Sequence, residues 1–120
     1  MPIRVFKTAW FSKAAKRARI ADAELCAAIS QVELGQADDL GGGVFKKRLD
    51  KNRHRSIILA KAGSFWVYEY LFAKKDRANI SDGELIDYRV LAKGYASLTG
   101  HQLDELLKDR DFMEICDEDE

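Results

Sequence analysis

The chain has 120 residues, of which 47% are hydrophobic, and its 20 Lys and Arg side chains balance 20 Asp and Glu side chains. This length and composition predict one domain with one hydrophobic core. No segment approaches the roughly 20 apolar residues of a membrane span, and the N-terminus has no apolar run of signal-peptide length. A net charge of zero, taken alone, argues against a nucleic-acid-binding protein.

The charges are nevertheless divided unevenly along the chain. Residues 1–80 carry 16 Lys and Arg against 8 Asp and Glu, a net charge of +8, whereas residues 81–120 carry 4 against 12, a net charge of −8. Such asymmetry indicates a polyanion-binding surface joined to an acidic element. The alternative is that both segments are ordinary solvated surface.

The first third of the chain predicts one strand and two helices. Residues 3–7 form a short strand, and Thr8 is a plausible N-cap for a helix that runs to about Ala18. Asp22 is expected to cap a second helix, which ends at Gly35. These two helices are expected to form an αα-hairpin.

The middle of the chain predicts a set of antiparallel strands. The glycines at 41–43 are the clearest break in the sequence and suit a sharp entry into a sheet. Three stretches rich in β-branched, aromatic and aliphatic residues follow, at residues 44–49, 54–60 and 65–73. The intervening turns, 50–53 and 61–64, are short enough for hairpins.

The last third predicts helices and a final strand. Ser81 to Glu84 is a capping box that opens a long helix, and Thr99 to Gln102 repeats this signature before a short helix. Residues 112–116 suit a last strand, and residues 117–120 are an acidic tail. The predicted order is therefore β-α-α-β-β-β-α-(α)-β, an α+β fold in one domain over residues 1–120.

The two cysteines, Cys26 and Cys116, are far apart in sequence and form no CxxC pattern. Cys26 falls on the apolar side of its predicted helix. The sequence therefore predicts a cytosolic protein without disulfides or a metal site.

Cationic residues gather on the strands and strand ends, in three clusters at residues 46–48, 53–55 and 74–77. Alternate residues of a strand share a face, so Lys46 and Arg48 should point to one side of the sheet. Arg55 can reach that side across a tight hairpin, and both it and Lys46 are expected to be exposed. Strand alternation should turn the side chain of His54 away from that of Arg55, unless a bulge intervenes or His54 sits at the start of the strand.

The element order, the Leu40–Val44 entry to the sheet, the spacing of Lys46, Arg48 and Arg55, and the stretch from Phe72 to Ile80 together resemble the RelE/ParE superfamily of type II toxin–antitoxin toxins. Within it, the chain looks like the RelE-like or HigB-type branch, over roughly residues 3–96. The resemblance implies an N-terminal αα-hairpin packed on a small, mostly antiparallel sheet with C-terminal helices. It also implies an acidic, flexible antitoxin as partner, mRNA and the ribosome as targets, and a cytoplasmic location without cofactor or membrane.

Nine residues are candidates for the site, and the resemblance points to five of them: Lys46, Arg48, Arg55, Arg77 and Lys74. Those expected to be catalytic are Lys46, Arg48, Arg55, Arg77 and His54. Those expected to bind substrate are Lys74, Lys75, Arg53 and Lys47. An RNase that uses the RNA's own 2′-OH must stabilise a dianionic transition state, which fixed cations can do without a metal.

The proton acceptor is open between two residues. Neighbouring cations disfavour the charged form of Lys46, which makes it one candidate. The imidazole of His54 is the other, since histidine exchanges protons near neutral pH. No cluster of Asp, Glu and His on the strands suggests a Mg²⁺ or Zn²⁺ site.

One departure concerns an aromatic residue. Some RelE-type enzymes carry a tyrosine shortly after the arginine that corresponds to Arg77, where it helps to position the substrate. Residues 78–81 contain no tyrosine, so either His54 positions the substrate or activity is weak. Trp66, Tyr68 and Tyr70 are expected to share one strand face, either as core or as a platform for a base.

The alternatives to a nuclease are a ParE-like protein that binds DNA gyrase and an inactive relative. The acidic segment from Asp104 to Glu120 is either solvated surface or a shield over the cations.

Overall fold

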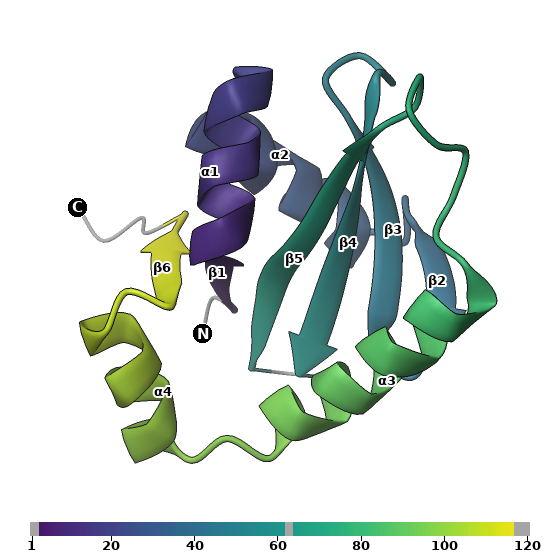
Figure 1. The fold of residues 1–120 in the computed structure, drawn as a ribbon. Helices are drawn as coiled ribbons and strands as arrows, with labels where there is room; N and C mark the ends of the chain where they lie inside the picture. The colour runs from purple at the N-terminus through teal and green to yellow at the C-terminus, as the bar shows by residue number, and fades with distance from the viewer. Residues whose placement is uncertain (1–2, 62–63, 117–120) are drawn as a thin grey trace.

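The computed structural model describes residues 3–61 and 64–116, in which two helices follow the first strand, four strands come next, and two helices precede the last strand. The strands are β1 (Arg4–Thr8), β2 (Asp38–Gly41), β3 (Val44–Leu49), β4 (His54–Lys61), β5 (Phe65–Ala73) and β6 (Phe112–Ile115). The helices are α1 (Ala9–Ala18), α2 (Asp22–Glu33), α3 (Asp82–Ala96) and α4 (Gly100–Lys108) (Figure 1). The predicted α+β class is confirmed, and β2 is an element that the sequence analysis missed.

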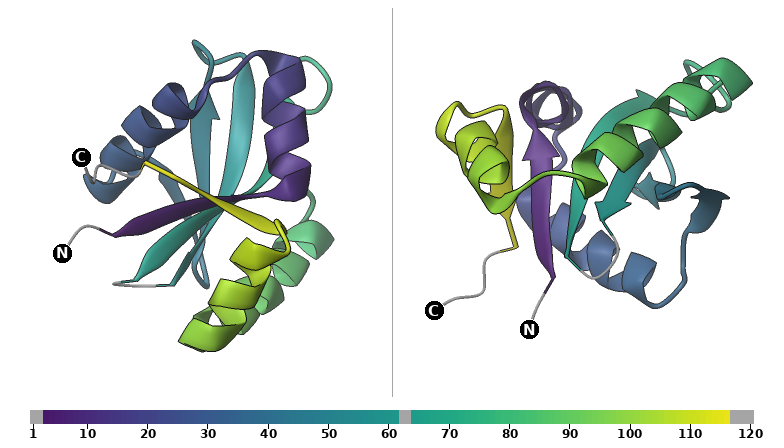
Figure 2. Two further views of the ribbon diagram at one scale, coloured as in Figure 1. Left: turned by 90° about the vertical axis from the view of Figure 1, so that its left-hand side faces the viewer. Right: turned by 90° about the horizontal axis from the view of Figure 1, so that it is seen from below.

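The strands described form one sheet in the order β2-β3-β4-β5-β1-β6. β1 pairs with β5 in parallel, and the other neighbouring pairs are antiparallel, which confirms a mostly antiparallel sheet. β1 reaches only residues 65–68 of β5. Among the described residues, no strand pairs with the second half of β5 on that side; α1 packs there instead (Figures 1 and 2).

Alternation along the strands divides the side chains between two faces. The α2 face carries Leu49, Ile58 and Tyr68, which pack in one hydrophobic cluster with buried residues of α1 and α2. The α3 face carries Ile57 and Phe72, which pack with Val44, Leu59 and side chains of α3. α4 covers a smaller cluster beside β1 and β6.

The helix caps largely follow the prediction. The Thr8 hydroxyl accepts a hydrogen bond from the amide of Phe11 at 3.0 Å, and both predicted capping boxes are present. The cap assigned to Asp22 is wrong, because Ala21 is the N-cap and Asp22 instead accepts a bond from Lys7 Nζ at 2.7 Å. α1 packs on β5 and β1, whereas α2 packs on β3, and their association as a hairpin stays a prediction.

The glycine run turns an edge strand rather than simply breaking the chain. β2 ends at Gly41 and pairs with β3, and Gly42 makes the turn with a φ of +66°. The stem of Arg89 from α3 crosses this turn so closely that a Cβ at Gly42 would lie 2.7 Å from its Cγ. Both the backbone angle and the close approach require glycine here.

The expectation of two unpaired cysteines is wrong. Cys26 of α2 and Cys116, directly after β6, form a disulfide with their Cα atoms 5.4 Å apart. The pair was missed because 90 residues separate them in sequence, and only the fold brings the end of β6 beside α2.

A bulge changes the face of one tyrosine. Ile58 pairs with Tyr68 and Ile57 with Tyr70, which leaves Glu69 as an extra residue in β5. Tyr68 therefore lies on the α2 face, in the core, while Tyr70 lies on the α3 face. The prediction that Trp66, Tyr68 and Tyr70 share one face is wrong for Tyr70.

The acidic C-terminal segment lies at the β6 edge of the sheet, as far as residue 116. Helix α4 contacts β6, whereas Lys46 and Arg48 are on β3, near the opposite edge (Figure 1). This described part does not cover those cations. The tail at 117–120 and residues 62–63 of the predicted 61–64 turn lie outside the described residues. No helix in the described segments is long and apolar enough to cross a membrane.

Candidate nucleic-acid interface

Two rows of side chains cross the strands on the α3 face. In one row, Arg48, Arg55 and Phe72 are cross-strand partners on β3, β4 and β5. In the next row, Lys46, Ile57 and Tyr70 are partners in the same way. Because adjacent strands are about 4.8 Å apart, the register brings Lys46, Arg48 and Arg55 close together on one face. These two rows are called the cation rows below.

Lys46 is held by neighbours on both sides. Its Nζ lies 3.3 Å from Oδ1 of Asn79 and 3.7 Å from a carboxylate oxygen of Asp38, and its side chain is only 17% exposed. The expected exposure of Lys46 is therefore wrong. The segment before α3 contributes Asn79 and fixes where the ammonium group points.

Arg55 is also covered, since it is 9% exposed overall. Its Nη1 donates to the backbone carbonyls of Asn52, at 3.0 Å, and His54, at 3.3 Å. Its expected exposure is wrong, because β4 is a central strand and the preceding turn folds back over the guanidinium. Within the described residues this guanidinium forms no ion pair, and Arg48 beside it is exposed without one.

Arg77 is the most strongly engaged of the candidate cations. It forms a bidentate pair with Glu84, with Nη–Oε distances of 2.5 and 3.1 Å. It also approaches the Tyr70 hydroxyl at 3.4 Å and lies 5.6 Å from the centre of the Phe72 ring. The pair with Glu84 raises the pKa of Arg77 and lowers that of Glu84 to about 2. Glu84 meanwhile accepts a bond from the amide of Ser81 and so caps α3.

His54 is not brought to the cation rows. Its cross-strand partner is Leu49, a core residue of the α2 face, so alternation turns the imidazole to the side opposite Arg55. Its Nδ1 lies 3.0 Å from Asp50, which also accepts a bond from Arg53 at 2.8 Å. These two contacts, Arg53 first, lower the pKa of the Asp50 carboxyl.

The remaining candidates are spread around the same end of the sheet. Lys47 donates to the carbonyl of Gln36 at 3.1 Å, on the α2 side. Lys74 and Lys75 are exposed after the end of β5, where the amide of Lys74 bonds the carbonyl of Arg53. Lys47 is thus apart from both lysines.

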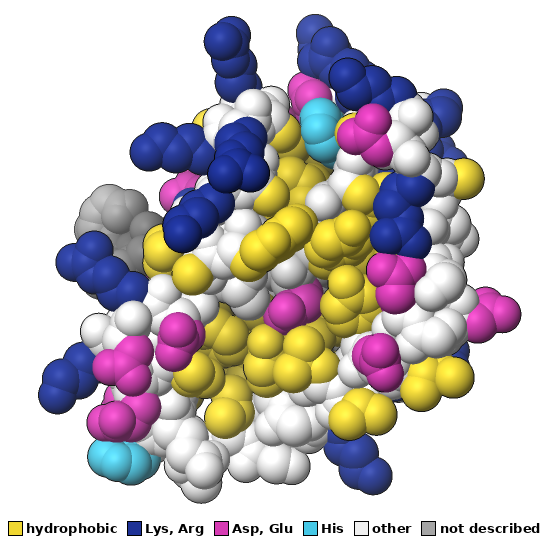
Figure 3. All heavy atoms as spheres, viewed as in Figure 1, with side chains coloured by type: hydrophobic (Ala, Val, Ile, Leu, Met, Phe, Trp, Pro, Cys, Tyr) yellow, Lys and Arg dark blue, Asp and Glu magenta, His cyan; other side chains and the backbone are white. Residues whose placement is uncertain are grey.

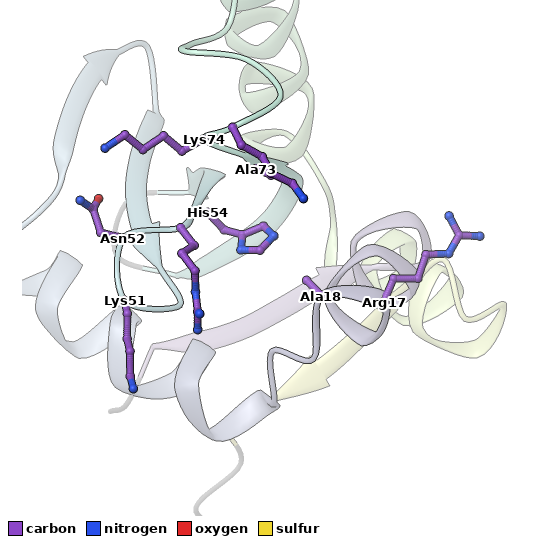
Figure 4. Close-up of a pocket in the computed structure, with 9 residues that line it drawn as sticks. Arg17, Ala18, Lys51, Asn52, His54, Ala73 and Lys74 are labelled. Atoms are coloured by element: carbon purple, nitrogen blue, oxygen red, sulfur yellow. The ribbon is translucent and has the colours of Figure 1, made fainter.

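An open groove lies between α1 and the second half of β5. Its first part, of about 440 Å³, is lined by Trp10, Tyr70 and Arg77, among others. Its second part, of about 810 Å³, is bordered by Arg17 of α1, the 51–53 turn and the end of β5 (Figure 4). The parts share lining residues, so they form one groove, called the α1 groove below. Figure 4 shows the His54 ring between the turn and the Ala18 end of α1.

The face with this groove combines apolar and cationic side chains. Figure 3 shows hydrophobic side chains over its centre, with Lys and Arg along α1 and along the upper rim. Trp10 stacks on Tyr70, with ring centres 5.1 Å apart, although 52% of the tryptophan stays exposed. Tyr70 stacks in turn on Phe72, with ring centres 5.8 Å apart.

Sequence reasoning missed Trp10 and assigned Tyr70 to the wrong face. Tyr70 was expected beside Trp66 and Tyr68 because the bulge was not foreseen, and Trp10 lies on a helix whose direction over β5 no local pattern reveals. Glu84 was identified only as a cap, although its spacing of seven residues from Arg77 left an ion pair possible. Among the residues described, no three His, Cys, Asp or Glu side chains gather in a group that could hold a metal ion.

Comparison with known proteins gives one match. A family model described as the RelE toxin of the RelE/RelB toxin–antitoxin system matches residues 3–115. No curated protein and no solved structure matches the chain.

Proposed function

The chain belongs to the RelE family of toxins from toxin–antitoxin systems, and we propose that it is a metal-independent endoribonuclease that cleaves mRNA on the ribosome. The observation that carries this proposal is the register of the cation rows, which gathers Lys46, Arg48 and Arg55 on one face. A cognate antitoxin is the expected partner of a toxin of this family.

The chemistry assigns each cation a part. Cleavage by the 2′-OH develops negative charge on the phosphate, and oriented cations stabilise that charge more than they stabilise the ground state. Arg55, held by two carbonyls, and Arg48 beside it are suited to this role. Lys46 is the preferred proton acceptor, because His54 points to the other side of the sheet.

Two aromatic residues extend the proposal. Tyr70 lies next to Ile57 in the row of Lys46, and its hydroxyl is 3.4 Å from Arg77. It can take the positioning part for which residues 78–81 supply no tyrosine. Phe72, the partner of Arg55 at the end of the other row, is 6% exposed and stacks on Tyr70, so it supports that ring.

For Arg77 we propose a structural role rather than a catalytic one. Its charge is shared with Glu84, so in this state it holds the end of the site together rather than meeting a phosphate. We propose that Arg53, Lys74 and Lys75 bind substrate phosphates at the edge of the site, and that Lys47 has the smallest part. The HigB-type branch and a cytoplasmic location are part of the same proposal.

The second candidate function is that of a ParE-like protein that binds DNA gyrase, or of a relative without activity. The observation that favours it is the engagement of the candidate cations, since Arg55 is 9% exposed and Arg77 is paired with Glu84. A nuclease needs these groups to face the scissile phosphate. The two functions are separated by a cleavage assay.

The test uses the purified chain with ribosomes that carry a defined mRNA, in the presence of EDTA. We expect cleavage to leave 2′,3′-cyclic phosphate ends and to stop when the nucleotide at the cut site is 2′-deoxy. Cleavage that requires a divalent metal would refute the metal-independent mechanism. Trapping of gyrase on DNA without RNA cleavage would establish the second candidate.

A further inference from the structure

The α1 groove combines aromatic and cationic side chains on an open surface. Along α1, Trp10, Ala14, Arg17 and Ala18 recur at helical spacing and line one side of it. The other side is formed by β5 and the segment that follows it. At 1.5 Å per residue, the helical side from Trp10 to Ala18 is about 12 Å long.

The apolar end of the groove is an open aromatic stack. The rings of Trp10 and Tyr70 are nearly parallel, at 27°, with their centres 5.1 Å apart. Tyr70 is half-buried against Phe72 and Tyr88, whereas Trp10 is 52% exposed. An indole that is fixed from one side by a neighbouring ring and remains half-exposed can receive a further flat ring.

The cationic end of the groove is strongly positive. Its exposed cations are Arg17, Lys51, Arg53, Lys74 and Lys75. Arg53 is paired with Asp50, whereas the other four form no ion pair within the described part of the chain, and Asp76 is the acidic residue of the groove lining there. His54 lies between the two ends.

We propose that the α1 groove binds single-stranded RNA, with a base stacked on Trp10 and the following phosphates at Arg17, Lys74 and Lys75. Aromatic rings that stack bases beside a cationic track are how proteins hold single strands without reading their sequence. The groove meets the cation rows at Tyr70 and Phe72, so the bound strand runs on toward them. This inference rests on the proposed function and assigns it a path for the RNA beside the cut site.

The test measures binding of a short 2′-O-methyl oligouridylate, which cannot be cleaved through its 2′-position, by fluorescence anisotropy at low salt. Because loss of one stacked base costs about 1–3 kcal/mol, Trp10→Ala should weaken binding about tenfold. Trp10→Phe keeps a ring and should retain most of the affinity. Leu34→Ala, which alters an exposed apolar residue at the end of α2, should leave the affinity unchanged.

Fold and single-strand preference are checked in parallel. Circular dichroism and thermal unfolding report whether each variant is folded. Should the Ala variant be destabilised, Arg17→Gln, at an exposed residue of the same groove, replaces it and should also weaken binding. Wild-type affinity in both Trp10 variants would overturn the proposal. Equal affinity for the same RNA as a duplex would also overturn it. Competition by polyglutamate that weakens in the Trp10 variants as much as RNA binding does would overturn it too, because the groove would then suit an acidic protein segment.

This outcome is independent of cleavage. If RNA binding depends on Trp10 but the protein does not cut mRNA, the proposed RNA site in the groove stands and the proposed nuclease activity is refuted. If the protein cuts mRNA but its RNA binding does not depend on Trp10, the nuclease activity stands and the RNA site in the groove is refuted.

Discussion

The cation rows and the α1 groove differ in what holds their charged side chains. Lys46 and Arg55 of the cation rows are largely covered, Lys46 by the side chains of Asn79 and Asp38 and Arg55 by backbone carbonyls. Arg17 and Lys75 of the α1 groove are exposed and have no ion pair among the described residues. A covered cation that is held in one orientation can contact the charge that develops in a transition state at a fixed, short distance. An exposed cation attracts any polyanion within about a Debye length, roughly 10 Å at 0.1 M salt.

The largest effect is expected from a bond that belongs to neither region. The Cys26–Cys116 disulfide closes a loop of 90 residues, and such a constraint on the unfolded chain is worth about 4 kcal/mol. Reduction should therefore lower the free energy of unfolding by about that amount, measured by urea denaturation with and without a thiol reductant. Cys116→Ser should reproduce the loss and make the protein insensitive to reductant.

If both regions keep their structure, the reduced protein should still bind and cleave RNA under conditions in which it stays folded. Equal urea midpoints in the oxidised and the demonstrably reduced protein would contradict a stabilising role for this bond.

The cation rows should respond to substitution through rate. Lys46→Ala removes a positioned group and should lower the rate of mRNA cleavage about 10²- to 10³-fold, equivalent to about 2–4 kcal/mol of transition-state stabilisation. Its affinity for uncleavable RNA should change little. Lys74→Ala, in the α1 groove, is the matched control and should act mainly on affinity. The comparison fails if both variants lose rate and affinity in the same proportion.

Arg55 needs a separate measurement, because it also supports the fold. Arg55→Ala leaves the carbonyls of Asn52 and His54 without their donor, and should cost about 1–3 kcal/mol of stability besides the rate. Arg55→Lys retains the charge and reduces the hydrogen bonding. Cleavage that persists in a folded Arg55→Ala protein would remove this residue from the mechanism.

The sequence predicted these regions unequally. Strand alternation was sufficient to put Lys46, Arg48 and Arg55 on one face, because the two strands involved are regular. It failed at Tyr70, where Glu69 is an extra residue in the strand. Local patterns carry no signal for a one-residue bulge.

Contacts between distant segments were the other limit. The disulfide and the stacking of Trp10 on Tyr70 join residues 90 and 60 positions apart, and the sequence pattern around each gives no partner. β2 was missed for a different reason. Three successive glycines are typical of a loop, and no local pattern shows that the turn they make pairs β2 with β3.

Glu84 offers a smaller effect, on the pH dependence of stability. Its pKa is lowered to about 2, first by the hydrogen bond from Arg77, so the folded state binds its proton more weakly than the unfolded state. The stabilisation is therefore present above the ordinary glutamate range and is lost as the pH falls from about 5 toward 2. Glu84→Gln can still cap Ser81 but should show a shallower fall in melting temperature over this range. Asp82→Asn, in the same turn, should follow the wild type, and a variant profile as steep as that of the wild type would exclude the pair as its cause.

The smallest effects concern single charges and the salt dependence of RNA binding. Each phosphate contact on a single strand contributes about 0.7 to the slope of log affinity against log salt. Lys75→Gln should lower this slope by about that amount, whereas Lys93→Gln, on the exposed surface of α3, should leave it unchanged. Glu84→Gln should act in the opposite direction, because it releases Arg77, which lines the α1 groove, from its ion pair. A slope raised by about 0.7 in this variant would show that the ion pair with Glu84 is what keeps Arg77 from contacting a phosphate. An unchanged slope would mean that Arg77 is withheld from RNA by its place over Phe72 as well as by its partner.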